Sequence, residues 1–172
     1  MGLKDDILVL SPIKKFIGQV LAAFLIIYYG RIQIRSMHGF FGIHELPEMF
    51  SLLISYFSVI VIINSFNLID GVDGLAGTLG LMSSALFGLY FLSKGMAPYY
   101  TLAFSLCGSL LAFLICNFQP AKIFMGDTGS LLIGVVNAVL ALKFIDPGNG
   151  PEFSTPMEAS PAIGFTILMI PL

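Results

Sequence analysis

Two carboxylates and two amides lie close together in a glycine-rich stretch, residues 64–77. Asp70 and Asp73 are three positions apart, so on a helical turn they share a face, and Asn64 and Asn67 precede them. The simplest alternative is that the Asp-Gly pairs form only a turn between helices. Acidic residues embedded in a membrane protein are costly, however, and this makes them candidates for function.

A second polar group opens the chain, where Asp5 and Asp6 precede an apolar run and Lys15. Adjacent residues on a helix point about 100° apart, so the two acids have different roles unless the backbone turns between them. Lys15 and Gln19 are four positions apart and share a helix face. The alternatives are that the acids cap the helix and that lysines here reach toward lipid headgroups.

The third group is Asn117 together with the sequence Gly-Asp-Thr-Gly-Ser at 126–130. This pattern predicts a turn that opens a helix, where Asp127 or Thr128 could serve only as an N-cap. The same place could supply a carboxylate for a metal ion and backbone N–H groups for a phosphate. Mg²⁺ is usually held by one or two carboxylates with substrate phosphates completing its shell, so it suits these aspartates.

The composition predicts an integral membrane protein. Of 172 residues, 57% are hydrophobic and 10% are charged, against about 25% charged in a typical soluble domain. The net charge of −2, without a basic block, gives no indication of nucleic-acid binding. We expect an all-α fold: a polytopic transmembrane helix bundle forming one domain over 1–172, with about five spans and a truncated sixth. The expected spans are 12–29, 47–66, 75–93, 99–116, 129–145 and, cut short, 161–172.

An odd-even count of these spans places all three polar groups on one side of the membrane. His38 and His44 fall on the opposite side, which argues against zinc chemistry and against a Ser-His or Cys-His nucleophile. The positive-inside rule leaves the orientation open, because four lysines or arginines lie on each side.

The three groups, in this order, resemble the polyprenyl-phosphate sugar-1-phosphate transferases of the glycosyltransferase 4 type. The sequences Asn-Leu-Ile-Asp-Gly-Val-Asp-Gly at 67–74 and Leu-Ser-Pro-Ile-Lys-Lys at 10–15 are most similar to the undecaprenyl-phosphate GlcNAc-1-phosphate transferase branch. The phospho-MurNAc-pentapeptide transferases are the alternative branch. The resemblance implies Mg²⁺-dependent transfer (Mn²⁺ as a substitute) of a sugar-1-phosphate from a UDP-sugar to undecaprenyl phosphate, releasing UMP, in cell-envelope polysaccharide synthesis.

The resemblance also implies roles for individual residues. Asp127 would be a catalytic metal ligand with Asp73 as a second ligand, and Asp5 and Asp6 would activate or orient the lipid phosphate. Lys15 would neutralise diphosphate charge. The residues expected to shape the substrate pocket are Asn67, Asp70, Asp73 and Asn117. The implied setting is the inner (plasma) membrane, multi-pass, with the active site facing the cytoplasm and a homodimer as one allowed assembly.

The chain also departs from the family, which has about twice as many spans and a later histidine-rich loop. We therefore expect the chain to be the central fragment of the enzyme and inactive alone. Two other classes compete with this interpretation. Acids in glycine-broken helices are also typical of a cation-coupled transporter, which would place them near the bilayer midplane. A non-catalytic assembly subunit would fit the short length.

Overall fold

The computed structural model describes residues 11–37, 44–118 and 121–146. Every regular element in these ranges is helical: α2 (Pro12–Phe24), a π-helical segment η1 (Leu25–Tyr29), α3 (Glu48–Ile69), α4 (Leu75–Ser93), α5 (Ala97–Asn117) and α6 (Gly126–Ile145). Among the described residues, α3, α4, α5 and α6 are long and apolar enough to cross a membrane. The predicted all-α membrane bundle is therefore confirmed.

The predicted first span is built from two shorter pieces. The 13 residues of α2 begin with Pro12, which suits a first helical turn because it lacks a backbone N–H. The five residues of η1 continue the run to Tyr29, where the ring of Tyr28 stacks on Phe24 and the ring of Tyr29 meets both edge-on. The predicted sixth span, 161–172, lies outside the described residues.

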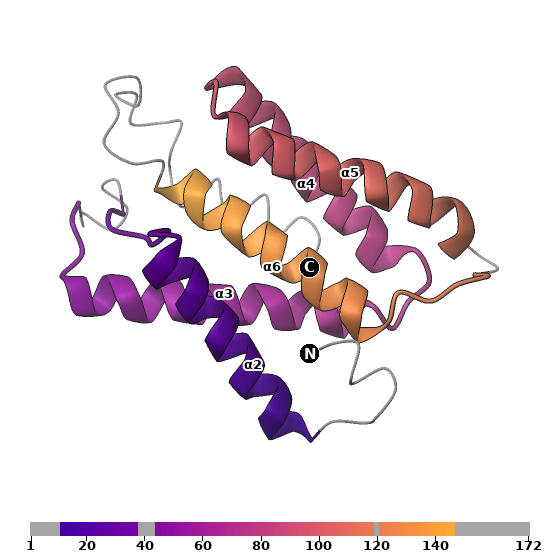
Figure 1. The fold of residues 1–172 in the computed structure, drawn as a ribbon, viewed down its shortest axis with the longest axis horizontal. Coiled ribbons are helices and arrows are strands. Elements are labelled where there is room, and N and C mark those ends of the chain that lie inside the picture. Colours follow the sequence, from indigo (N-terminus) through magenta and orange to yellow (C-terminus); the bar gives the residue numbers. More distant parts are fainter. Residues whose placement is uncertain (1–10, 38–43, 119–120, 147–172) are drawn as a thin grey trace.

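The helices pack as neighbours in two pairs, with α6 between them (Figure 1). The α4 and α5 helices form an antiparallel hairpin, α3 lies along α6, and α2 packs against α3. The α6 helix is the most enclosed of the four long helices. It can approach α3 closely because Gly134 has no side chain: a Cβ there would lie 2.8 Å from the Cα atom of Ile63.

A buried polar contact joins α4 to α6 in the interior of the bundle. The Ser83 hydroxyl donates to Asn137 Oδ1 at 2.7 Å, and Asn137 Nδ2 donates to the Ile133 carbonyl at 3.0 Å. Both side chains are almost completely buried. Because lipid supplies no hydrophobic force between helices, such hydrogen bonds and close packing hold them together.

The segment between η1 and α3 packs against α3 at the end of the bundle that lies away from the polar groups. Its buried Ile34 backbone donates to Ser55 Oγ at 2.9 Å and accepts from Ser51 Oγ at 2.6 Å. The Arg35 N–H donates to Asp146 Oδ2, just beyond α6. The α3 serines thus satisfy backbone groups that would be costly to bury unpaired, and the far ends of α3 and α6 are tied together.

Candidate functional site

The centre of the candidate site is an ion pair between the first turns of two helices. Lys15 Nζ on α2 lies 2.6 Å from Asp127 Oδ2 on α6. Asn67, near the end of α3, donates from Nδ2 to Asp127 Oδ1 at 2.8 Å and to Ser130 Oγ at 3.0 Å. The structure thereby brings together one residue from each of the three polar groups, as the span count predicts.

Local backbone geometry explains how Asp127 reaches this position. Gly126 has φ of +66°, a left-handed conformation that glycine adopts without steric cost, and Asp127 follows it in the first turn of α6. The residue that precedes the helix at the N-cap position is Met125. The interpretation of Asp127 or Thr128 as the N-cap is therefore wrong. The Asp127 carboxylate instead lies in the positive field of the helix N-terminus and turns toward Lys15.

The pair is only partly shielded from solvent, with 33% of the Lys15 side chain and 27% of the Asp127 side chain exposed. The two carboxylate oxygens of Asp127 accept from different residues, Oδ2 from Lys15 and Oδ1 from Asn67. An incoming anion could therefore bind Lys15 while the carboxylate remains held by Asn67. The arrangement suits a site that exchanges its internal ion pair for contacts with a charged substrate.

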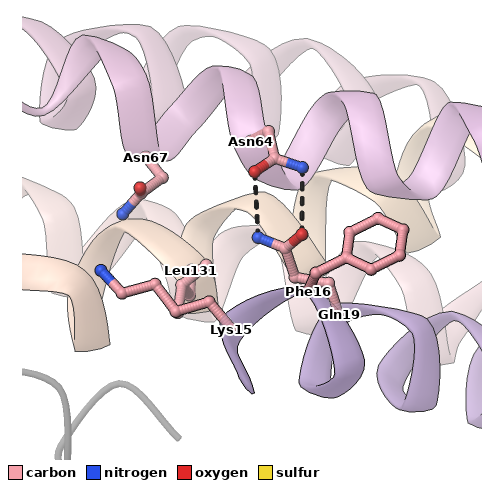
Figure 2. A pocket seen from close by; sticks show the side chains of 6 residues that line it. All are labelled: Lys15, Phe16, Gln19, Asn64, Asn67 and Leu131. Carbon is pink, nitrogen blue, oxygen red and sulfur yellow. Dashed lines mark hydrogen bonds between the residues drawn. The ribbon is translucent and has the colours of Figure 1, made fainter. Parts of the chain in front are cut away.

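A cavity of about 310 Å³ lies beside this pair, between α2 and α3 (Figure 2). Lys15 and Gln19 from α2 face Asn67 and Asn64 from α3, and the amides of Gln19 and Asn64 bond to each other. Apolar side chains complete the lining. The six lining residues are Lys15, Phe16, Gln19, Asn64, Asn67 and Leu131. The cavity therefore has both a cationic end and an apolar wall.

Asp70 and Asp73 lie on the short turn that joins α3 to α4. Asp70 directly follows the last residue of α3 and is half-buried, whereas Asp73 is exposed. Gly74 has φ of +74°, and its N–H donates to Asn117 Oδ1 at 2.8 Å. Asn117 Nδ2 donates in turn to the Ile123 carbonyl at 2.8 Å. Asn117 thus ties the turn that carries both aspartates to the segment leading into α6.

The residues present fit a magnesium ion that is held mainly by substrate. The described part of the chain brings no three Asp, Glu, His or Cys side chains close enough to hold a metal. Mg²⁺ seldom needs such a cage, because one or two carboxylates and substrate phosphates suffice. Asp127, and Asp73, which is exposed on the turn between α3 and α4, are the candidate ligands of this kind. Their metal roles stay predictions, as do those of Asp5 and Asp6, which lie outside the described residues.

Sequence reasoning missed two features of this site. It paired Lys15 with a substrate diphosphate and did not anticipate Asp127 as its partner within the chain. It also predicted that Gln19 and Lys15 share one face of their helix, but it did not identify Asn64 as the hydrogen-bond partner of Gln19. A signal was present, since Asn64 precedes Asn67 by three positions and Gln19 follows Lys15 by four, which puts each pair on one helix face.

Comparison with known proteins identifies the family of this sequence. Residues 1–145 match the family described as "Glycosyl transferase family 4". The chain is 37% identical over 147 residues, 83% of its length, to a "Probable undecaprenyl-phosphate N-acetylglucosaminyl 1-phosphate transferase" of Bacillus subtilis, covering 40% of that protein. In an alignment of 168 positions that covers 90% of this chain, it is 35% identical to a "Decaprenyl-phosphate N-acetylglucosaminephosphotransferase" of Mycobacterium leprae, of which the alignment covers 42%.

A third relative, a "Phospho-N-acetylmuramoyl-pentapeptide-transferase" of Moorella thermoacetica, matches a shorter part of the chain. The chain is 42% identical to it over 79 residues, which are 46% of this chain and 25% of that protein. The chain thus spans less than half the length of each of these relatives. Because the family match extends over most of the sequence and includes every site residue named above, the chain belongs to glycosyl transferase family 4.

Proposed function

We propose that the protein containing this chain transfers a sugar-1-phosphate, GlcNAc-1-phosphate in the first instance, from a UDP-sugar to undecaprenyl phosphate, releasing UMP. The observation that carries the proposal is the contact of Lys15, Asn67 and Asp127, which come from three distant segments and meet at one end of the bundle. Two relatives that bear the names of polyprenyl-phosphate sugar-phosphate transferases support the same reaction.

In this reaction an oxygen of the lipid phosphate attacks the sugar-linked phosphorus of the UDP-sugar. A new P–O bond forms, the bond from that phosphorus to the oxygen bridging to UMP breaks, and UMP leaves with the electron pair. Phosphoryl transfer needs mostly alignment and neutralisation of charge. Lys15 supplies a cation that turns from Asp127 toward the diphosphate, and Asn67 keeps the carboxylate oriented while this happens.

Asp127 would hold the Mg²⁺ (or Mn²⁺) together with substrate phosphate oxygens, and Asp73 on the adjacent turn would be its second protein ligand. A bound divalent ion neutralises developing phosphate charge in such reactions. Asp5 and Asp6 would orient or activate the lipid phosphate. Asp70 and Asn117 would shape the nucleotide pocket, Asn117 by fixing the turn through Gly74.

The described acids favour an enzyme over a cation-coupled transporter. A transporter would carry acids near the middle of its spans. In the described ranges, Glu48, Asp70, Asp127 and Asp146 instead lie at or beside helix ends, and Asp73 lies on a turn. Acids at helix ends can meet water-soluble nucleotide sugars at the membrane surface. We place this surface on the cytoplasmic face of the plasma membrane.

An assay of the complete protein with radiolabelled UDP-GlcNAc and undecaprenyl phosphate tests the proposal. Asp127→Asn keeps the shape and removes the charge, and we expect transfer to fall by about a hundredfold or more, as when an electrostatic group of a transition state is removed. The matched control is Asp146→Asn at the other end of α6, which should keep full activity. Unchanged product yield in Asp127→Asn would refute the proposed role of this carboxylate.

The phospho-MurNAc-pentapeptide reaction is the second candidate, because one relative with that name is 42% identical over 79 residues. The GlcNAc-type relatives match 83% and 90% of the chain, against 46%, 77% and 60% for three relatives named as phospho-MurNAc-pentapeptide transferases, and we take the longer matches as support for the GlcNAc donor. Supplying UDP-GlcNAc and UDP-MurNAc-pentapeptide in competition to the complete protein separates the two. We expect the label from UDP-GlcNAc in the lipid product.

A further inference from the structure

Gln19 and Asn64 form a reciprocal amide pair one helical turn from Lys15 (Figure 2). Each side-chain NH₂ donates to the carbonyl oxygen of the other at 3.0 Å. Asn64 Nδ2 also donates to the Ile60 carbonyl at 2.8 Å, which fixes the Asn64 side chain against its own helix. Gln19 is only 8% exposed, so loss of its partner would leave a nearly buried amide unsatisfied.

The apolar side chains of α2 offer few contacts that could fix the rotation of this helix against α3. Lys15, Gln19, Ala23 and Ile27 follow one another at intervals of four and share a face. Gln19, Ala23 and Ile27 are buried, and Ala23 offers only a methyl group. The other faces carry exposed large side chains, namely Ile13, Phe16, Ile17 and Leu21. Lipid is as apolar as these side chains, so close packing and directional hydrogen bonds determine how such a helix sits against its neighbour.

The spacing couples the amide pair to the ion pair. Gln19 follows Lys15 by four positions on α2, and Asn64 precedes Asn67 by three on α3, so the two helices are joined at two successive levels. At the outer level, Lys15 and Asn67 both contact Asp127. At the inner level, Gln19 is hydrogen-bonded to Asn64. Lys15 and Asn67 of the outer level and both residues of the inner level line the same cavity of about 310 Å³. A shift or rotation of α2 would therefore move Lys15 away from Asp127.

We propose that Gln19 and Asn64 are positioning residues, which hold α2 in the register that keeps the Lys15 ammonium on Asp127 at the edge of the cavity. As far as it concerns catalysis, this inference rests on the transferase function proposed above. The placement of Lys15 can be measured separately from catalysis. Two experiments follow from this separation.

The first experiment measures placement by cross-linking in the complete protein. Lys15→Cys and Asp127→Cys are combined in a background lacking Cys107 and Cys116, and the pair is bridged by a short bis-methanethiosulfonate reagent. We expect efficient cross-linking, a severalfold lower yield after Gln19→Leu, and recovery in the exchange variant Gln19→Asn with Asn64→Gln, which restores an amide pair of the same total length. Leu21→Ala, on the exposed face of α2, should leave the yield unchanged.

The second experiment measures transfer kinetics in the complete protein. Gln19→Leu should lower kcat by about tenfold, since a misplacement of about 1 Å can cost up to about 10²-fold. In a Lys15→Met background the same change should lower kcat by less than about twofold, because Gln19 acts through Lys15. The exchange variant should recover kcat.

The inference is overturned if Gln19→Leu cross-links as well as its parent, if the exchange variant is as impaired as Gln19→Leu, or if Gln19→Leu costs the same kcat with and without Lys15. A parent protein that cross-links as expected but transfers no sugar phosphate would instead refute the proposed function and leave the positioning intact.

Discussion

Lys15 and Asp127 are 112 positions apart in the sequence, and the Lys15 ammonium nitrogen lies 2.6 Å from a carboxylate oxygen of Asp127. The residues between them cross the bundle repeatedly before α6 brings the carboxylate to the start of α2. The pair is partly exposed, so its contribution to stability is small, about 0–1 kcal/mol for a solvent-exposed pair. Under the proposed function, the pair holds opposite charges where a phosphorylated substrate and a cation would exchange partners.

Replacing Lys15 should affect catalysis more than stability. Lys15→Met removes the cation, and we expect kcat/KM to fall by about 10²-fold. Lys15→Arg keeps the charge, but its planar guanidinium fits a different geometry, so it should recover only part of the activity. Steady-state kinetics and thermal unfolding of both variants check this. A Lys15→Met enzyme with normal kinetics would show that the ion pair is dispensable.

Asn117 should act on the turn between α3 and α4 through its two side-chain bonds. Asn117→Leu leaves the Gly74 N–H and the Ile123 carbonyl without these partners, and we expect a loss of about 1–3 kcal/mol of stability. Asn117→Asp keeps an acceptor for the Gly74 N–H but places a nearly buried negative charge against the Ile123 carbonyl, so it should be destabilising as well. Thermal unfolding in detergent compares them. Equal stability of Asn117→Leu and the parent would contradict the role of Asn117 in fixing this turn.

Two glycines allow the same substitution to be compared at a crowded and at an open position. Gly134→Ala places a Cβ 2.8 Å from the Ile63 Cα atom, which is backbone and cannot turn aside, so we expect a loss of about 1–3 kcal/mol. Gly108→Ala on α5 meets nothing within 4 Å and should be neutral or stabilising by up to about 1 kcal/mol. Chemical denaturation in micelles measures both. If the two variants unfold alike, α3 and α6 are not closely packed at Gly134.

The buried contact of Ser83 with Asn137 should contribute a measurable coupling between α4 and α6. A double-mutant cycle of Ser83→Ala and Asn137→Leu should give about 0.6 kcal/mol, and at most about 1.7 kcal/mol, as found for hydrogen bonds between membrane helices. Ser83→Ala alone should be destabilising because it leaves buried Asn137 Oδ1 without this donor. Strictly additive effects would mean that the two side chains do not interact.

The long helices could be predicted closely from the sequence. The expected spans 47–66, 75–93, 99–116 and 129–145 agree with α3 to α6 to within three residues at either end. Length and hydropathy determine these elements, because a membrane-crossing helix must cover about 30 Å of hydrocarbon. The π-helical end of the first span carries no such signal, since Leu25–Tyr29 continues the apolar run of the helix before it without a break.

The candidate site could be predicted only as a set of residues at one end of the bundle. Counting spans brings the three polar groups together, but it does not say that Lys15 contacts Asp127 or that Asn117 holds the Gly74 backbone. Those partners depend on the rotation of each helix about its axis and on which backbone groups need bonds. The contact of Ser51 and Ser55 with Ile34 could not be predicted for the same reason, because the spacing of serines does not show which buried backbone groups they bind.

Side-specific labelling of single cysteines in the complete protein tests most directly that the site is assembled on one face of the membrane. Cysteines are introduced one at a time at Asp73, at Asp127 and, at the other end of α4, at Lys94, and each is exposed to a membrane-impermeant thiol reagent from either side. We expect positions 73 and 127 to be labelled from the same side and position 94 from the opposite side. Labelling of positions 73 and 127 from opposite sides would contradict the shared site.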